Sequence, residues 1–201
     1  MTKLHRVCSI AVVLLAATSS VAQTIYFPNG AFDSYAKLNK LLNDWYSRQL
    51  TALHEPSLLT QSKNLSVQSY RFLWLRTFHQ PIAVRLEVKA DGTGILTTKI
   101  ASGAGGYAPG HLVTNTSKPL TEQQTESFLH KIDVDKFWEL PPVLLKEQQG
   151  DDGSQWIIEG VKGGKYHIAS QWSPEQGPIH DLGTVLAFEL AELQIPKSEI
   201  Y

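Results

Sequence analysis

Residues 82–102 read IAVRLEVKADGTGILTTKIAS, and their pattern decides the fold. Apolar and polar residues alternate from Ile82 to Lys89, which is typical of a strand with one buried face. Asp91-Gly92 follows, and this dipeptide favours a two-residue hairpin because both central residues of such a turn need positive φ. The stretch therefore predicts two antiparallel strands joined by a tight turn.

A second hairpin is predicted for residues 154–172, SQWIIEGVKGGKYHIASQW, with its turn at Gly163-Gly164. A two-residue turn there places Gly160 opposite His167, and the imidazole is expected to lie in the empty place left by the glycine. Because side chains alternate between faces, Glu159 and His167 point to opposite sides of the sheet. They form no catalytic pair unless a bulge at Gly160 changes the register.

Three helices are predicted around these hairpins. Apolar residues at helical spacing predict an amphipathic helix over about residues 33–53, a capped helix from Thr121, and a C-terminal helix ending before Pro196. The apolar stripe of the first helix consists of Leu38, Leu41, Leu42, Trp45 and Gln49. Residues 67–78 are apolar on both faces, as in a central strand covered on both sides. We predict an α+β fold, with a mainly antiparallel sheet of about five strands and helices packed on one face.

Residues 1–22 have the parts of a secretory signal peptide in order: basic residues, a short apolar run at 10–17, and small residues at Ser20 and Ala22. We expect cleavage after Ala22, followed by one globular domain over residues 23–201. No later run reaches the roughly 20 apolar residues that span a bilayer, so no integral membrane segment is expected after cleavage. The predicted location is the periplasm or the exterior of the cell.

Composition narrows the classes of partner. The chain has 18 Lys and Arg against 19 Asp and Glu, without the basic excess that nucleic-acid binding requires. Its single cysteine, Cys8, lies inside the predicted signal peptide, so the mature domain forms no internal disulfide. A secreted eukaryotic domain more often carries disulfides, so this indicates a bacterial protein.

Residues 103–110, GAGGYAPG, form a glycine-rich loop. A phosphate-binding loop would need a Lys-Ser/Thr pair opening a helix, or glycines at fixed offsets before one, and neither is present. We expect a turned surface loop, in which Tyr107 and His111 are the side chains able to bind a ligand.

No metal and no cofactor are expected. The spacing of Gly153 and Glu159 resembles part of a calcium loop, but the first and third ligand positions fall on Gln148 and Gly150, which carry no carboxylate. The histidines lack the spacing of zinc ligands, and there is no cysteine pair.

The candidate acid–base residues are Glu159, His167 and Asp152. Glu159 stands among apolar neighbours, where burial raises the pKa of a carboxyl group. The structural alternative is a Glu159 paired with a lysine or arginine, and a partly buried, hydrogen-bonded His167.

Arg71 and Arg76, together with Arg85 on the next strand, are the candidate ligand-binding cations. Guanidinium groups bind carboxylates and phosphates through paired hydrogen bonds. Glu87 and the acidic loops offer ordinary structural partners instead.

Several runs of the chain resemble uncharacterised exported bacterial proteins, in which a DG hairpin is followed by an amphipathic helix and a second hairpin. The similar runs are SYRFLWLR at 69–76, DGTG at 91–94, DGSQWIIE at 152–159 and Tyr166-His167. The resemblance covers most of residues 67–193. It implies a bacterial envelope or secreted setting and assigns no catalytic residues.

Two functions follow as hypotheses. The first is a non-catalytic domain that binds a partner protein, an envelope polymer or a small ligand at the open face of the sheet or at the glycine-rich loop. The alternative is a periplasmic hydrolase that uses Glu159 or His167 as acid–base, aided by Asp152. A hydrolase requires these side chains to converge in a pocket, whereas a binding domain requires an exposed apolar or aromatic patch.

Overall fold

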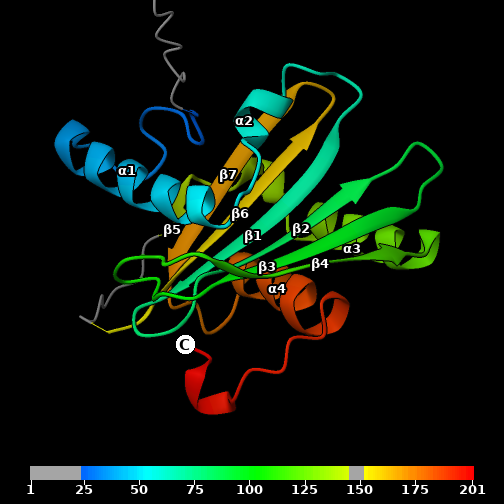
Figure 1. Cartoon of the computed structure of the whole chain (residues 1–201). Helices are drawn as coiled ribbons and strands as arrows, with labels where there is room; N and C mark the ends of the chain where they lie inside the picture. The colour runs from blue at the N-terminus through cyan, green and yellow to red at the C-terminus, as the bar shows by residue number, and fades with distance from the viewer. Residues whose placement is uncertain (1–23, 145–151) are drawn as a thin grey trace, which may run out of the picture.

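The computed structural model describes residues 24–144 and 152–201 (Figure 1). The predicted signal peptide and its cleavage site lie outside the described residues, as do Gln148 and Gly150 of the calcium-loop comparison.

The sheet has seven strands in the order β4-β3-β2-β1-β6-β7-β5, and not the five that we predicted. The strands are β1 Gln68–Arg76, β2 Ile82–Val88, β3 Gly94–Ala101, β4 Leu112–Leu120, β5 Val143–Leu144, β6 Ser154–Lys162 and β7 Lys165–Trp172. All pairings are antiparallel except that of β5 with β7, which is parallel. The sheet is therefore mixed. Both extra strands lie at edges, where a polar or very short segment still pairs on one side.

Both predicted hairpins are present, but the first turn is longer than the predicted two-residue turn: the Lys89 amide donates to the Thr93 carbonyl at 2.8 Å, and Gly92 has positive φ whereas Asp91 does not. Gly160 lies opposite His167 and Glu159 opposite Ile168, in a continuous β6–β7 register without a bulge. The turn glycines Gly163 and Gly164 both have positive φ, as a two-residue hairpin turn demands.

Helices cover both faces of the sheet, which corrects the prediction of one covered face (Figure 1). The first face carries α1 Ala36–Ala52 and α2 Leu58–Gln61. The second carries α3 Glu122–Val134, the 3-10 turn η1 Phe137–Glu139, and α4 Pro178–Thr184 with its π-helical continuation η2 Val185–Leu190. The two-sided cover follows from β1, which the sequence marks as apolar on both faces and which packs against both layers.

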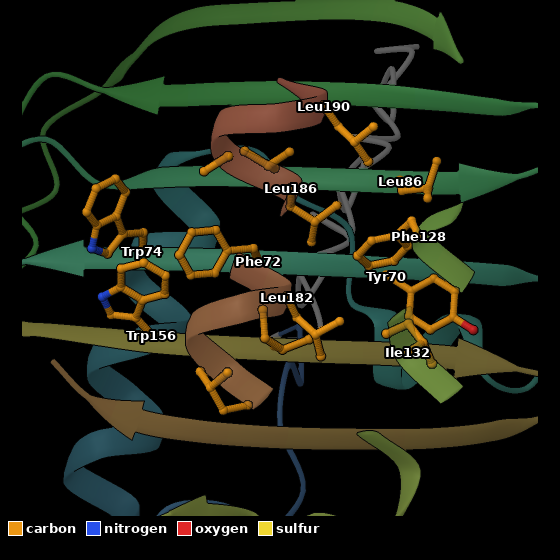
Figure 2. Packing of buried hydrophobic residues seen from close by; sticks show 14 of the residues in the cluster. Tyr70, Phe72, Trp74, Leu86, Phe128, Ile132, Trp156, Leu182, Leu186 and Leu190 are labelled. Atoms are coloured by element: carbon orange, nitrogen blue, oxygen red, sulfur yellow. The ribbon is translucent and has the colours of Figure 1, made fainter. Parts of the chain in front are cut away.

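The larger core lies between β1, β6 and the second helical layer (Figure 2). Phe72 and Trp74 of β1 pack against Trp156 of β6, with ring centroids 4.8 and 5.2 Å apart from it. Leu182 and Leu186 cover these rings from the C-terminal helix. That helix begins as predicted but ends earlier, at Leu190, and an extended tail follows with one 3-10 turn, η3 Lys197–Glu199.

Gly183 allows α4 to lie directly on Trp156, and we expect Gly183→Ala to destabilise the protein. A methyl group there would stand 2.6 Å from ring carbons of Trp156. Alanine gains about 1 kcal/mol of helix propensity, but overpacking costs about 1–3 kcal/mol, so we expect a net loss of up to about 2 kcal/mol. Urea unfolding measures it, with Thr184→Ala as the control on the same turn. A stabilised Gly183→Ala protein would contradict this packing.

Candidate functional site

Glu159 is paired with a cation, as in the structural alternative. Arg71 lies directly opposite it on β1, and Arg71 Nε donates to Glu159 Oε2 at 2.8 Å. The Tyr166 hydroxyl donates to the other carboxylate oxygen at 2.9 Å. The side chains of Arg71 and Glu159 are fully buried. Burial raises the pKa of Glu159, although Arg71 and the tyrosine oppose this shift.

Glu55, which the sequence analysis missed, completes this buried charge cluster. Its carboxylate is 3.3 Å from Arg71 Nη1, 2.9 Å from Arg85 Nε and 3.0 Å from Lys99 Nζ. Burial alone would raise the pKa of Glu55, but the three cations outweigh it and hold the pKa below its ordinary value. A signal was available: the β1–β2–β3 registers put Arg71, Arg85 and Lys99 on one side of the sheet, and buried cations need an anion.

The buried charge cluster, defined as Glu55, Arg71, Arg85, Lys99, Glu159 and Tyr166, is structural. The carboxylates of Glu55 and Glu159 are at most 1% exposed, so no substrate reaches them. Arg71 Nη1 also donates to the Pro56 carbonyl at 2.7 Å, and Lys99 Nζ to the His54 carbonyl at 2.6 Å. The cluster thus fastens the α1–α2 connection to the sheet.

The three candidate acid–base residues do not come together. His167 lies on the opposite face from Glu159, as predicted. Its imidazole does not fill the space at Gly160, because the Phe137 ring does: a methyl group on Gly160 would be 2.7 Å from that ring. His167 packs edge-on against Phe137 instead, and burial lowers its pKa. Asp152 is exposed and precedes β6, roughly 20 Å along the strand from Glu159.

The glycine-rich loop is held against the body of the protein. Gly105 and Gly106 donate to the carbonyl groups of His79 and Thr77 at 2.9 and 3.1 Å. Trp45 of α1 donates to the Gly105 carbonyl at 3.0 Å. A methyl group on Gly105 would be 2.7 Å from the backbone of Leu75, so this close approach requires glycine. The loop amides bond within the protein rather than form a phosphate cradle.

The four candidate ligand-binding residues have different surroundings. Arg71 is buried in the charge cluster, and Arg76 pairs with Glu199 at 3.0 Å. His111 is exposed, with Nδ1 3.1 Å from Ser102 Oγ. Tyr107 is exposed at the tip of the glycine-rich loop.

An apolar pocket of about 240 Å³ lies between α1, the ends of the central strands and the glycine-rich loop. We call it the α1 pocket. It is lined by Leu42, Trp45, Tyr46, Leu75, Thr77, Gly105, Gly106, Gln155 and Trp172. None of these side chains is acidic or basic, and burial raises the pKa of Tyr46, which keeps its phenol neutral. The pocket therefore suits an uncharged group.

Two exposed aromatic residues lie next to the lining of the α1 pocket along the chain. Phe78 and Tyr107 directly follow the lining residues Thr77 and Gly106, and their ring centroids are 6.3 Å apart. They are 55% and 61% exposed. We call them the rim pair.

The α1 helix is rotated relative to the prediction, which leaves more apolar surface open. Its buried residues include Asn39 and Tyr46, while Leu38 and Leu41 are 40% and 57% exposed. The N-terminal segment causes this rotation: Phe32 packs edge-on against Tyr46 at 4.7 Å and donates its backbone amide to the Asn39 side chain at 3.0 Å. Leu38 and Leu41 thus lie on the helix stripe that continues into the pocket at Leu42 and Trp45.

A wider groove of about 780 Å³ runs along the start of α1. Most of its lining residues are polar or charged, and some of them are already paired: Asp33 accepts from the Tyr35 amide, and Lys40 pairs with Asp44 at 2.6 Å. We assign the candidate site to the α1 pocket because its lining is mainly apolar, with few polar groups, as ligand sites are.

Comparison with known proteins gives no functional assignment, since no family model matches the chain and no curated protein matches its sequence. No helix in residues 24–144 or 152–201 combines the length and apolar character needed to cross a bilayer.

Proposed function

We propose that this protein is a non-catalytic binding domain, exported from a bacterial cell, which captures a partner protein by taking one uncharged apolar side chain of that partner into the α1 pocket. The observation that carries the proposal is a neutral, aromatic-lined pocket, with two exposed aromatic residues directly following residues of its lining. The export setting rests on the signal-peptide pattern of residues 1–22.

The size of the pocket supports an anchor side chain. An apolar cavity of about 150 Å³ holds a benzene molecule, so 240 Å³ accommodates one aromatic ring or a branched aliphatic group. Interfaces commonly gain most of their binding energy from such an anchor in a desolvated pocket. Gln155 supplies the polar contact: within the described residues, its side chain has only a long hydrogen bond, 3.4 Å, from the Tyr46 hydroxyl.

The surroundings of the pocket support a protein rather than a small molecule as partner. The rim pair and the exposed Leu38 and Leu41 extend the apolar surface beyond the cavity. Exposed apolar surface around a pocket is typical of protein interaction sites. Arg48 lies over the Trp45 ring at 5.9 Å and provides a cation for an acidic residue next to the anchor.

The hydrolase hypothesis has no comparable support. Among the described residues, Glu159 and His167 lie on opposite faces, and Asp152 is at the far end of the strand. Of the two binding locations expected from the sequence, the open sheet face is not present at the central strands, because both of their faces are covered. The other location, the glycine-rich loop, borders the α1 pocket.

We expect 5-fluoroindole, a neutral mimic of an anchor ring, to bind the α1 pocket with a dissociation constant on the order of millimolar. Broadening of its ¹⁹F NMR signal measures binding, and N-acetyl-tryptophanamide should displace it. Leu42→Trp, which fills the pocket, should abolish the broadening. Val113→Trp on the edge strand β4, at an exposed position outside the pocket lining, is the matched control and should leave binding unchanged.

Methyl β-glucoside serves as the competing probe. If it displaces 5-fluoroindole more strongly than N-acetyl-tryptophanamide does, the ligand is an envelope polymer and the partner-protein proposal is wrong. Equal binding by wild-type protein and Leu42→Trp would show that the α1 pocket is not the site.

A further inference from the structure

The tail after the C-terminal helix folds back onto a polar site at the end of the sheet (Figure 1). Glu199 Oε2 is 3.0 Å from Arg76 Nη1 and 3.6 Å from His79 Nε2. The Tyr201 hydroxyl is 2.8 Å from His79 Nδ1. One short segment thus places a carboxylate and a phenol against Arg76, the last residue of β1, and His79, in the turn that follows.

The same site also binds the tail backbone. The main-chain oxygen of Tyr201 accepts hydrogen bonds from the Trp156 indole nitrogen, at 3.2 Å, and from the Ser154 hydroxyl. Figure 2 shows the indole nitrogens of Trp74 and Trp156 at the same end of the packed core. Ser154 and Trp156 are buried, so they are fixed donors rather than mobile surface groups.

Arg76 is the built-in cation of this site. Its side chain is only 3% exposed, and its guanidinium lies over the Trp74 ring at 4.7 Å. Burial lowers the pKa of Arg76, which Glu199 partly offsets. The Nε atom of Arg76 is buried and has no hydrogen-bond partner among the described residues. A desolvated guanidinium with spare donor capacity is a strong binding group for a carboxylate.

We propose that Arg76, His79, Ser154 and Trp156 form a peptide-binding site, specific for an extended segment with a glutamate two residues before a tyrosine, which residues 199–201 occupy in the free protein. Arg76 and His79 bind the glutamate carboxylate of the segment, and His79 also binds the tyrosine hydroxyl. The buried donors Ser154 and Trp156 bind the main chain of the segment. The site does not include the α1 pocket, so the inference stands independently of the proposed function.

Occupation by its own tail makes the site switchable. A segment tethered to the protein has an effective concentration of about millimolar, so an external peptide of equal affinity competes only above that range. Removal of residues 197–201 should therefore open the site to ligands in trans.

The test uses the protein without residues 197–201 and the synthetic peptide PKSEIY, which matches residues 196–201. We expect titration calorimetry to show binding of this peptide. The peptide with Gln in place of Glu should bind about tenfold more weakly or worse, because it loses the charge-assisted bond to Arg76. No binding by the folded shortened protein, or equal binding of both peptides, would overturn the proposal.

A second measurement uses the full chain, in case the shortened protein does not fold. Glu199→Gln should loosen the tail and raise the rate of tryptic cleavage after Lys197 about tenfold. Glu192→Gln is the matched control, because Glu192 pairs with Lys118 outside this site. Cleavage of Glu199→Gln at the wild-type rate would equally refute the site.

Discussion

Glu55→Gln is expected to destabilise the protein by about 3–5 kcal/mol, because removing one partner of a buried ion pair leaves its charge uncompensated. Here three cations, Arg71, Arg85 and Lys99, share the carboxylate. Glutamine has nearly the same size as glutamate, so the loss of stability comes from removing the negative charge and not from creating a cavity. Urea unfolding at pH 7 measures it.

Glu87→Gln is the matched control for this experiment. Glu87 also contacts Arg85, but its side chain is 46% exposed, and exposed ion pairs contribute only about 0–1 kcal/mol. If both variants lost the same stability, the buried charge cluster would not hold the α1–α2 connection in place.

The pH dependence gives an independent check. The pKa of Glu55 is lower in the folded than in the unfolded chain, so its carboxylate stabilises the fold above the ordinary pKa of about 4.3. This contribution is lost as the pH falls through the folded-state pKa. The stability difference between wild type and Glu55→Gln should therefore be full at pH 7 and shrink below about pH 4. Glu159, whose pKa burial raises, has the opposite dependence, but it is present in both proteins.

Trp156→Ala is expected to cost about 3–5 kcal/mol, the range for removing a large aromatic side chain from a core. Trp156 contacts Phe72 and Trp74, supports α4 at Gly183, and donates its indole N–H to Ser154 and to the tail. The measurement is the free energy of unfolding in urea. Trp156→Phe should retain part of the packing and lose about 1–3 kcal/mol, which keeps the comparison possible if the alanine variant does not fold.

Trp172→Ala tests whether the α1 pocket is a binding site or a part of the core. Trp172 is only half-buried at the α1 pocket, so we expect a loss of about 1–2 kcal/mol, together with weaker binding of 5-fluoroindole. A loss as large as that of Trp156→Ala would mean that the pocket is part of the core rather than a binding site.

The local features of the fold were predictable because they depend on neighbouring residues. Turn glycines set the β6–β7 register, and alternation put Glu159 and His167 on opposite faces. β4 was missed because an edge strand exposes most of its side chains and therefore lacks an alternating apolar pattern. The rotation of α1 was missed because it depends on contacts with Phe32, a residue outside the helix.

The candidate site was predictable only in part for the same reason. The glycine-rich loop and Tyr107 were identified from the sequence, but the pocket beside them is assembled from α1, three strands and the loop. Glu55 belongs to a short connection with no periodicity, and its role depends on cations that come from three other segments.

The placement of β1 has a consequence for how the chain acquires its structure during synthesis. β1 is the central strand of the sheet. Its neighbour β6 comes much later in the sequence, since the paired residues Arg71 and Glu159 are 88 positions apart. Local hairpins form in about 1–10 μs, whereas a ribosome adds about 5–20 residues per second. One edge of β1 therefore stays unpaired for several seconds of translation. The core between β1 and β6 therefore forms only after most of the chain has been synthesised.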